Sequence, residues 1–181
     1  MEQLAVDEVI VLYKGRVVFR QYIPKKQKIW HKNLQTLRLW ATFMSVYLGK
    51  QRQHATAQTA THGTVLQLIR RVEGLGHKIF MGSYFISPAL CDELFQRKIN
   101  ACGTVLHDRR GMPRDIGPKS MKMERGTDIA TRVRGNLRAV RWKDRRDVYI
   151  LTNMHAPPAE GNFIQEYGQA IKPRVVEGYN A

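Results

Sequence analysis

The chain has 181 residues, and its 30 Lys and Arg outnumber its 15 Asp and Glu, which gives a formal net charge of +15. With 43% hydrophobic and 25% charged residues it is typical of a globular domain, alone or with an appendage, and not of a disordered chain. There is no apolar run of about 18 residues and no basic region followed by an apolar stretch at the N-terminus, so neither a membrane span nor a secretory signal is predicted. The excess positive charge favours a polyanionic partner, typically nucleic acid.

The first half of the sequence predicts strands and helices in alternation. Residues 6–23 are rich in β-branched and aromatic residues and break at Lys14-Gly15-Arg16, which predicts two strands joined by a tight turn that end at Pro24. Apolar periodicity and stop signals then predict, in order, a helix over 61–73, a strand over 78–85, a helix from Ser87-Pro88 to near Lys98 and a strand over 99–105. This succession indicates an α/β fold.

The second half is more basic and more irregular. Residues 109–125 carry scattered Gly and Pro and predict a loop, whereas 131–154 predict antiparallel strands with a charged turn over 143–147. From residue 156 onward the sequence contains three prolines and is expected to be extended. Between residues 97 and 147 there are 15 Lys or Arg and 6 Asp or Glu, so more than half of the excess charge lies in this stretch.

Several separate sequence motifs are spread along the chain. They are Ala5-Val6-Asp7-Glu8, Tyr13-Lys14-Gly15-Arg16, Phe19 to Lys26, Met44 to Gly49, Ser83-Tyr84-Phe85 with Ser87-Pro88, Gly103-Thr104-Val105, and Trp142 to Met154. Together they resemble the catalytic domain of piggyBac-type transposases, and in particular the piggyBac-element-derived proteins of vertebrate genomes. The resemblance covers most of the chain.

The resemblance implies an RNase H-like domain, in which helices flank a mixed sheet, with an inserted β-rich segment. It divides the chain into a partial RNase H-like core over 1–108, a basic insertion over 109–155 and an extended tail over 156–181. In the family, three aspartates hold two Mg²⁺ ions that activate the nucleophile and stabilise the leaving oxygen in DNA strand transfer. Carboxylates suit this task because hard cations prefer oxygen ligands.

Carried over position by position, the resemblance implies an incomplete set of aspartates. Asp7 matches the first aspartate, Gly82 stands where the second is expected, and the third would follow the Tyr179-Asn180 motif, after which this sequence ends. Asp7 is therefore expected to be a remnant metal ligand in a protein with no cofactor and no catalytic activity. Asp92 and Glu93 are not expected to substitute, since acids early in a helix are already favoured by the helix dipole.

Residues 29–43 depart from the family pattern. The family has a buried strand there that resembles Phe-Gly-Ile-Lys-Ile-Tyr-Lys-Leu-Cys-Asp, whereas residues 29–40 of this chain read IWHKNLQTLRLW. A back-translation of this segment, with third bases chosen to suit, gives the family-like residues when its frame is shifted by one base. We interpret the segment as a compensated frameshift. Because it loses the clean alternation of a half-buried strand, we expect it to dock less firmly.

The candidate DNA-binding residues are the basic residues of the insertion: Arg109, Arg110, Arg114, Lys119, Lys122, Arg132, Arg134, Arg138, Arg141, Lys143, Arg145 and Arg146. They could grip phosphate without reading sequence, or they could form an ordinary solvated face. Trp142 and Tyr149 could stack on bases, although aromatic residues in strands usually belong to the core. Cys91 and Cys102 are interpreted as small buried hydrophobic residues. The histidines, which show no metal-binding spacing, are expected at the surface or in loops.

Three functions remain open from the sequence. The first is an inactive, transposase-derived nuclear protein with residual nonspecific DNA binding. The second is a DNA- or protein-binding module without chemistry, and the third is an active strand-transfer enzyme, against which the missing carboxylates argue. DNA is the expected partner, no membrane is expected, and the sequence leaves protein partners open.

Overall fold

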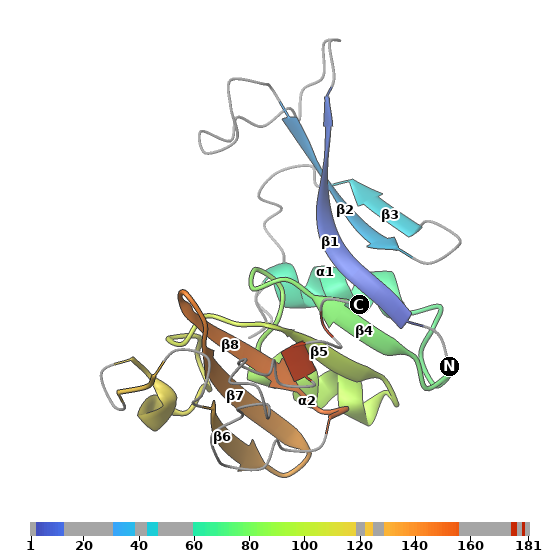
Figure 1. Ribbon diagram of the computed structural model, residues 1–181. Helices are drawn as coiled ribbons and strands as arrows, with labels where there is room; N and C mark the ends of the chain where they lie inside the picture. The colour runs from blue at the N-terminus through green and yellow to red at the C-terminus, as the bar shows by residue number, and fades with distance from the viewer. Residues whose placement is uncertain are drawn as a thin grey trace, which may run out of the picture.

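The computed structural model describes residues 3–12, 31–38, 43–46, 60–118, 122–124, 129–155, 175–176 and 179. The strands in these residues form an eight-stranded mixed sheet in the order β3-β2-β1-β4-β5-β8-β7-β6 (Figure 1). The elements are β1 Gln3–Leu12, β2 His31–Arg38, β3 Phe43–Val46, α1 Ala60–Ile69, β4 Lys78–Met81, α2 Pro88–Gln96, β5 Asn100–Thr104, the 3₁₀ turn η1 Arg114–Ile116, β6 Ile129–Arg134, β7 Leu137–Lys143 and β8 Asp147–Thr152. The expected α/β class is confirmed.

The altered segment of the sequence forms a strand of the sheet. β2 pairs with β1 in antiparallel register from Ala5 opposite Arg38 to Leu12 opposite His31, and β3 then pairs with β2. These ladders use backbone groups, so the expected weaker docking, which depends on side chains, stays a prediction. The second half of the strand pair expected over 6–23 lies outside the described residues.

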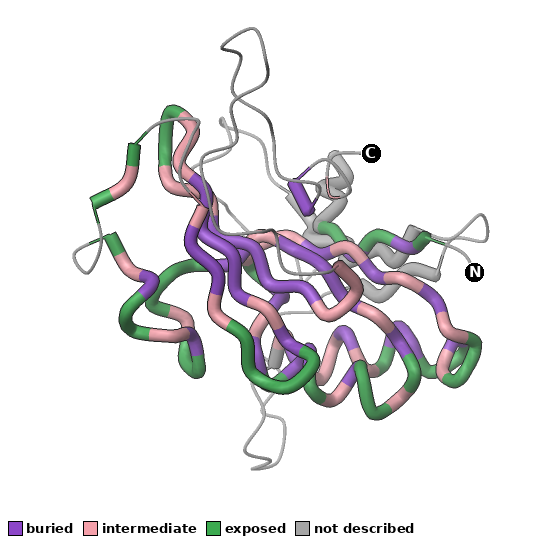
Figure 2. Tube along the Cα trace, turned by 60° about the horizontal axis from the view of Figure 1, so that its bottom comes forward, coloured by how far each residue is buried: buried purple, intermediate pink, exposed green. Residues whose placement is uncertain are grey.

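Helices cover one face of the sheet, and the described C-terminal residues cover the other. Alternate residues of β1 and β4, including Val6 and Met81, pack with α1 and α2 in the larger core cluster. On the opposite face, Val175 and Val176 join a second cluster, and the ring of Tyr179 lies 6.5 Å from that of Phe80 on β4. Figure 2 shows buried residues concentrated along the central strands. None of the helices in the described ranges is long and apolar enough to cross a membrane.

Both ends of α2 are capped, and the N-terminal cap is the one that the sequence predicts. The Ser87 hydroxyl accepts a hydrogen bond from the Leu90 N–H at 3.3 Å, and Pro88 occupies the first helical position. At the other end, the N–H of Ile99 donates to the carbonyl of Leu94 at 2.9 Å, which closes a Schellman motif. Its left-handed position, usually Gly, is occupied by Lys98 with φ of 59°.

Gly103 allows β5 to lie close to the turn after β4. A Cβ atom at this position would lie 2.2 Å from the Met81 carbonyl oxygen and 2.9 Å from the Ile86 side chain. Because the first of these contacts is with backbone, a larger residue would force β4 and β5 apart. This is a physical reason for glycine within the Gly103-Thr104-Val105 motif.

The antiparallel strands expected over 131–154 are confirmed as β6, β7 and β8. Residues 144–146 form the charged turn between β7 and β8, and β8 pairs with β5, so these strands continue the sheet. Two bonds secure this junction: the Val105 N–H donates to the Tyr149 carbonyl at 2.9 Å, and the Ala101 N–H donates to Asn153 Oδ1 at 2.6 Å.

A polar network joins α1 to α2. His62 Nε2 lies 2.7 Å from Glu93 Oε2, and the Arg97 guanidinium donates to Glu93 and to Glu73, each at 2.7 Å. Burial alone would raise the pKa of Glu93, but the hydrogen bonds from Arg97 and His62 hold that pKa below its ordinary value. The Arg97 guanidinium therefore ties Glu73, in the turn after α1, to Glu93 on α2, and Glu93 also contacts His62 near the start of α1.

The structure corrects the predicted ends of one helix and one strand and the expected position of a histidine. The helix expected over 61–73 ends at Ile69, because residues 70–76 turn and include Gly74 and Gly76 at positive φ. The strand expected over 78–85 ends at Met81, where the Phe85 N–H closes a turn onto the Gly82 carbonyl. His62 is buried on α1, so the expectation of histidines at the surface or in loops is wrong for this residue, whereas His77 is buried within the loop that leads into β4.

Both cysteines are confirmed as buried hydrophobic residues. Burial raises the pKa of Cys91 to about 12 and that of Cys102 to about 11. Neither thiol therefore forms the thiolate that nucleophilic or redox chemistry needs at neutral pH.

We predict that Lys98→Gly stabilises the protein by about 0.5–1 kcal/mol, because it removes the left-handed strain of a residue with a Cβ atom. Chemical denaturation of the purified chain measures the free energy of unfolding. Lys98→Ala is the matched control: it keeps the strain and should leave this free energy nearly unchanged. Equal effects of the two substitutions would contradict the strain argument.

We also predict that acid destabilises the network between α1 and α2. Since the folded-state pKa of Glu93 lies below its unfolded value of 4.5, the stabilisation from Glu93 is present above that value and is lost as the pH falls through the folded-state pKa. Glu93→Gln should lower the free energy of unfolding at neutral pH by about 1 kcal/mol and flatten its decline between about pH 5 and about pH 3. Asp108→Asn, which changes an exposed carboxylate, should leave that decline intact.

Candidate functional site

One edge of the sheet gathers residues from four strands. β1, β4 and β5 are mutually parallel, so their carboxyl ends point the same way, and β8 runs antiparallel to β5, so it begins at this edge. We call this region the carboxyl edge and define it as Asp7, residues 82–84, residues 105–109 and the turn 144–146. The turn between β7 and β8, in orange, lies at its upper left in Figure 1.

The register of β1 and β4 brings Asp7 beside Gly82. Val6 pairs with Met81 in parallel register, and Asp7 and Gly82 are the next residues on the two strands. Neighbouring strands lie about 4.8 Å apart, so side chains here would be close together. A Cβ atom at Gly82 would meet no atom within 4 Å. The fold thus provides space for a second carboxylate that the sequence does not supply.

The residues at this position do not fit a centre for two divalent cations. Asp7 is exposed and supplies a carboxylate, whereas Gly82 supplies no ligand. Within the described ranges, no three His, Cys, Asp or Glu side chains come close enough to hold a metal ion together. A pair of hard cations requires a concentrated set of oxygen ligands, which Asp7 does not provide by itself.

Arg109 fastens two loops of the carboxyl edge to each other. Its guanidinium donates to the carbonyl oxygens of Ser83 and Tyr84, in the turn after β4, and its backbone N–H donates to the Leu106 carbonyl at 3.1 Å. The neighbouring His107 ring lies 5.7 Å from the Tyr149 ring. Arg109, expected to contact DNA, therefore also positions the loops that follow β4 and β5.

Other basic candidates are engaged with acidic residues. Arg132 pairs with Asp115, Arg134 pairs with Asp92 on α2, and Lys143 Nζ lies 3.4 Å from Asp147. Asp115 is exposed, and its hydrogen bond from Arg132 lowers its pKa. The positive charge of the insertion is thus partly neutralised within the fold.

Arg141 differs from the other candidates because it is buried, with 2% of its surface exposed. It donates to the Gly117 carbonyl at 2.9 Å and to Asp147 Oδ1 at 3.2 Å, and it lies 5.8 Å from the centre of the Tyr149 ring. These contacts hold the chain after η1 against β7. Arg141 therefore has a structural position, and we leave it out of the candidate DNA contacts.

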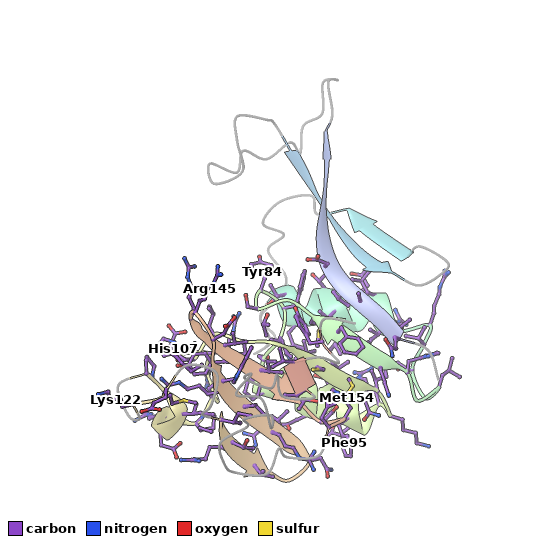
Figure 3. All side chains as sticks on the ribbon, in the orientation of Figure 1. Tyr84, Phe95, His107, Lys122, Arg145 and Met154 are labelled. Carbon is purple, nitrogen blue, oxygen red and sulfur yellow. The ribbon has the colours of Figure 1, made fainter. Side chains whose placement is uncertain are left out.

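The remaining candidates are more accessible. Arg138 is half-buried and donates to the Asn136 carbonyl. Lys119 lies outside the described residues. The exposed members are Arg110, Arg114, Lys122, Arg145 and Arg146. Figure 3 shows Arg145 and Lys122 projecting outward from different parts of the insertion.

The structure also decides the role of the aromatic residues. Trp142 and Tyr149 are 6% and 8% exposed, so both belong to the core and neither is available for stacking. The exposed aromatic residue at the carboxyl edge is Tyr84, at 54%. Tyr84 belongs to one of the sequence motifs, but the sequence predicted a strand over 78–85 and therefore gave no reason to expect an exposed ring at this position. The Gly82 position, at the end of an apolar strand, was the available signal for a turn.

Comparison with known proteins places this arrangement in a family. Among solved structures, the chain is similar to piggyBac transposase, seen by cryo-EM in a synaptic complex with hairpin DNA, with a TM-score of 0.81 and 26% sequence identity. The similarity covers 98% of this chain, which spans 37% of that transposase chain. It confirms the RNase H-like fold and the resemblance to piggyBac transposases. The family described as Transposase IS4 matches residues 1–181. The chain therefore belongs to the Transposase IS4 family.

Proposed function

We propose that this chain is a piggyBac transposase-derived protein that binds DNA nonspecifically and does not cleave it. The observation that carries the proposal is the pairing of Val6 with Met81, which sets Asp7 beside Gly82. At the place where the family holds a second carboxylate, the chain has no side chain. A metal-dependent strand transfer would lack a ligand there, whatever other segments contribute.

DNA binding is supported by charge and by accessibility. The insertion contains 13 Lys or Arg and 5 Asp or Glu, so about half of the net charge of +15 lies in it. Its exposed basic residues include Arg110, Arg114, Lys122, Arg145 and Arg146. Such residues bind phosphate and contribute affinity without sequence selectivity. The similarity to a transposase seen with hairpin DNA also supports DNA as the partner.

The remaining parts of the proposal concern organisation and location. Residues 1–108 form the core and 109–155 the basic insertion, in which Arg141 supports the fold. A DNA partner makes the nucleus the working location. A co-opted binding module would share this surface, and sequence-selective binding would favour it.

We predict that the purified chain, with Mg²⁺ or Mn²⁺, neither nicks nor joins DNA that carries transposon ends. Gel analysis of labelled duplexes measures this, with an active piggyBac transposase as the positive control. Cleavage above background that disappears in Asp7→Asn would overturn the proposal.

The matched variant is Gly82→Asp, for which the fold has space. Two adjacent carboxylates should give a Mn²⁺-dependent rise in melting temperature that the wild-type chain lacks, and Asp7→Asn in the same background should abolish that rise.

We predict a dissociation constant for short duplexes of about 10⁻⁴ to 10⁻⁶ M at physiological salt. A scrambled duplex of equal length should bind equally, because phosphate contacts carry no sequence information. Fluorescence anisotropy over a salt series tests both points. Absence of binding even at low salt would show that the basic residues form only a solvated face.

A further inference from the structure

Tyr84 is an exposed aromatic residue on a firmly held turn. The N–H groups of Phe85 and Ile86 donate to the Gly82 carbonyl at 3.1 and 3.3 Å, which fixes the turn. The Tyr84 ring packs edge-on against the Phe85 ring, with centroids 5.2 Å apart and an interplanar angle of 86°. Phe85 is itself buried, with 3% of its surface exposed. The Tyr84 ring therefore packs on the buried Phe85 ring and is also accessible to solvent.

A second anchor comes from the neighbouring loop. The Arg109 guanidinium donates to the Tyr84 carbonyl and to that of Ser83, so the turn after β4 is tied to the loop after β5. Leu106, in that loop, is 53% exposed. Isolated exposed apolar residues are common on protein surfaces. Here, however, the exposed ring and the exposed leucine lie on two loops that Arg109 joins.

Cationic side chains occur at the same edge. The turn between β7 and β8 carries Arg145 and Arg146, both exposed, and is closed by the Asp144 N–H, which donates to the Arg146 carbonyl at 3.1 Å. The start of β8 is held beside the end of β5 by the bond from Val105 to Tyr149. In Figure 3, Tyr84 and Arg145 both project at the upper edge of the part drawn with sticks, and Phe95 lies at the opposite end.

We propose that the carboxyl edge binds single-stranded DNA, with an unpaired base stacked on Tyr84 and flanking phosphates held by Arg145 and Arg146. This inference rests on the proposed DNA binding and adds a strand preference to it. An aromatic ring accepts the face of any base that is not already stacked, and each such stack typically contributes about 1–3 kcal/mol. In a duplex the base faces are covered by their neighbours, so duplex DNA gains only the phosphate contacts.

The proposed contact is independent of metal chemistry. Neither the Tyr84 ring nor the two arginines need a carboxylate at Gly82, so the surface persists without that ligand.

The test uses the full chain and fluorescence anisotropy with a short oligothymidylate, a duplex of the same length and the matching RNA strand. We expect the wild-type chain to bind the single DNA strand more tightly than the duplex. Tyr84→Ala should weaken single-strand binding by about 5- to 100-fold and leave duplex binding unchanged, whereas Tyr84→Phe should retain the preference. Phe95→Ala is the matched control, since Phe95 is 43% exposed at the opposite end.

The arginines have a separate test. Combined Arg145→Ala and Arg146→Ala should make the plot of log affinity against log salt concentration less steep for the single strand. The slope should fall by about 0.7 for each phosphate that the variant no longer neutralises. The matched control is Arg70→Ala with Arg71→Ala, two exposed arginines in the segment that leads into the opposite end of β4.

Each outcome bears on the inference in a defined way. Photocrosslinking of a bromouracil-substituted strand, mapped by mass spectrometry, should identify Tyr84 and needs no variant. Duplex binding without a single-strand preference, or a crosslink only elsewhere, would overturn this inference and leave the proposed function intact. Absence of all DNA binding would overturn both, and tighter binding of the RNA strand would overturn the assignment to DNA.

Discussion

The parallel pairing of β1, β4 and β5 determines what this fold can place together. Its tightest point is Gly103, where a single added carbon atom would lie 2.2 Å from a backbone oxygen of Met81. Because Met81 pairs with Gly103 in parallel register, the turns that follow β4 and β5 start at the same level, and Arg109 joins them. The carboxyl edge, with Asp7 beside Gly82, is a direct consequence of this register.

Some basic residues of the insertion are paired within the fold and others are exposed, and composition alone does not distinguish the two groups. Arg132 and Arg134 pair with acids on other elements, and Arg141 is buried against Asp147 and two backbone carbonyls. Leaving the buried Arg141 charge without its partner would be strongly destabilising, so Arg141 is committed to the fold. The ion pairs of Arg132 and Arg134 are exposed and contribute little to stability, but they partly neutralise the charge that these residues present. Net charge therefore overstates the number of cations available to DNA, and accessibility identifies the residues that remain.

The sequence predicted elements where local signals are strong. Ser87-Pro88 marked the start of α2 correctly, and the charged turn at 144–146 separated β7 from β8. Boundaries failed where a turn followed an apolar run, at Ile69 and at Met81, because periodicity alone does not register a change of backbone direction. The position of β8 beside β5 was beyond prediction, since it depends on a long-range pairing. At the candidate site, the resemblance supplied Asp7 and Gly82, but the exposure of Tyr84 and the burial of Arg141 required the fold.

Gly82 and Gly103 differ in whether the fold requires glycine at their position. At Gly103 the backbone leaves no space for a side chain, so glycine there is a requirement of the sheet. At Gly82 a Cβ atom would meet nothing within 4 Å, so the fold does not require glycine at this position. The sheet can consequently lose a catalytic carboxylate without losing its register. The proposed DNA-binding surface, formed by Tyr84, Arg145 and Arg146, depends only on that register. It therefore does not require the carboxylates with which the family carries out strand transfer.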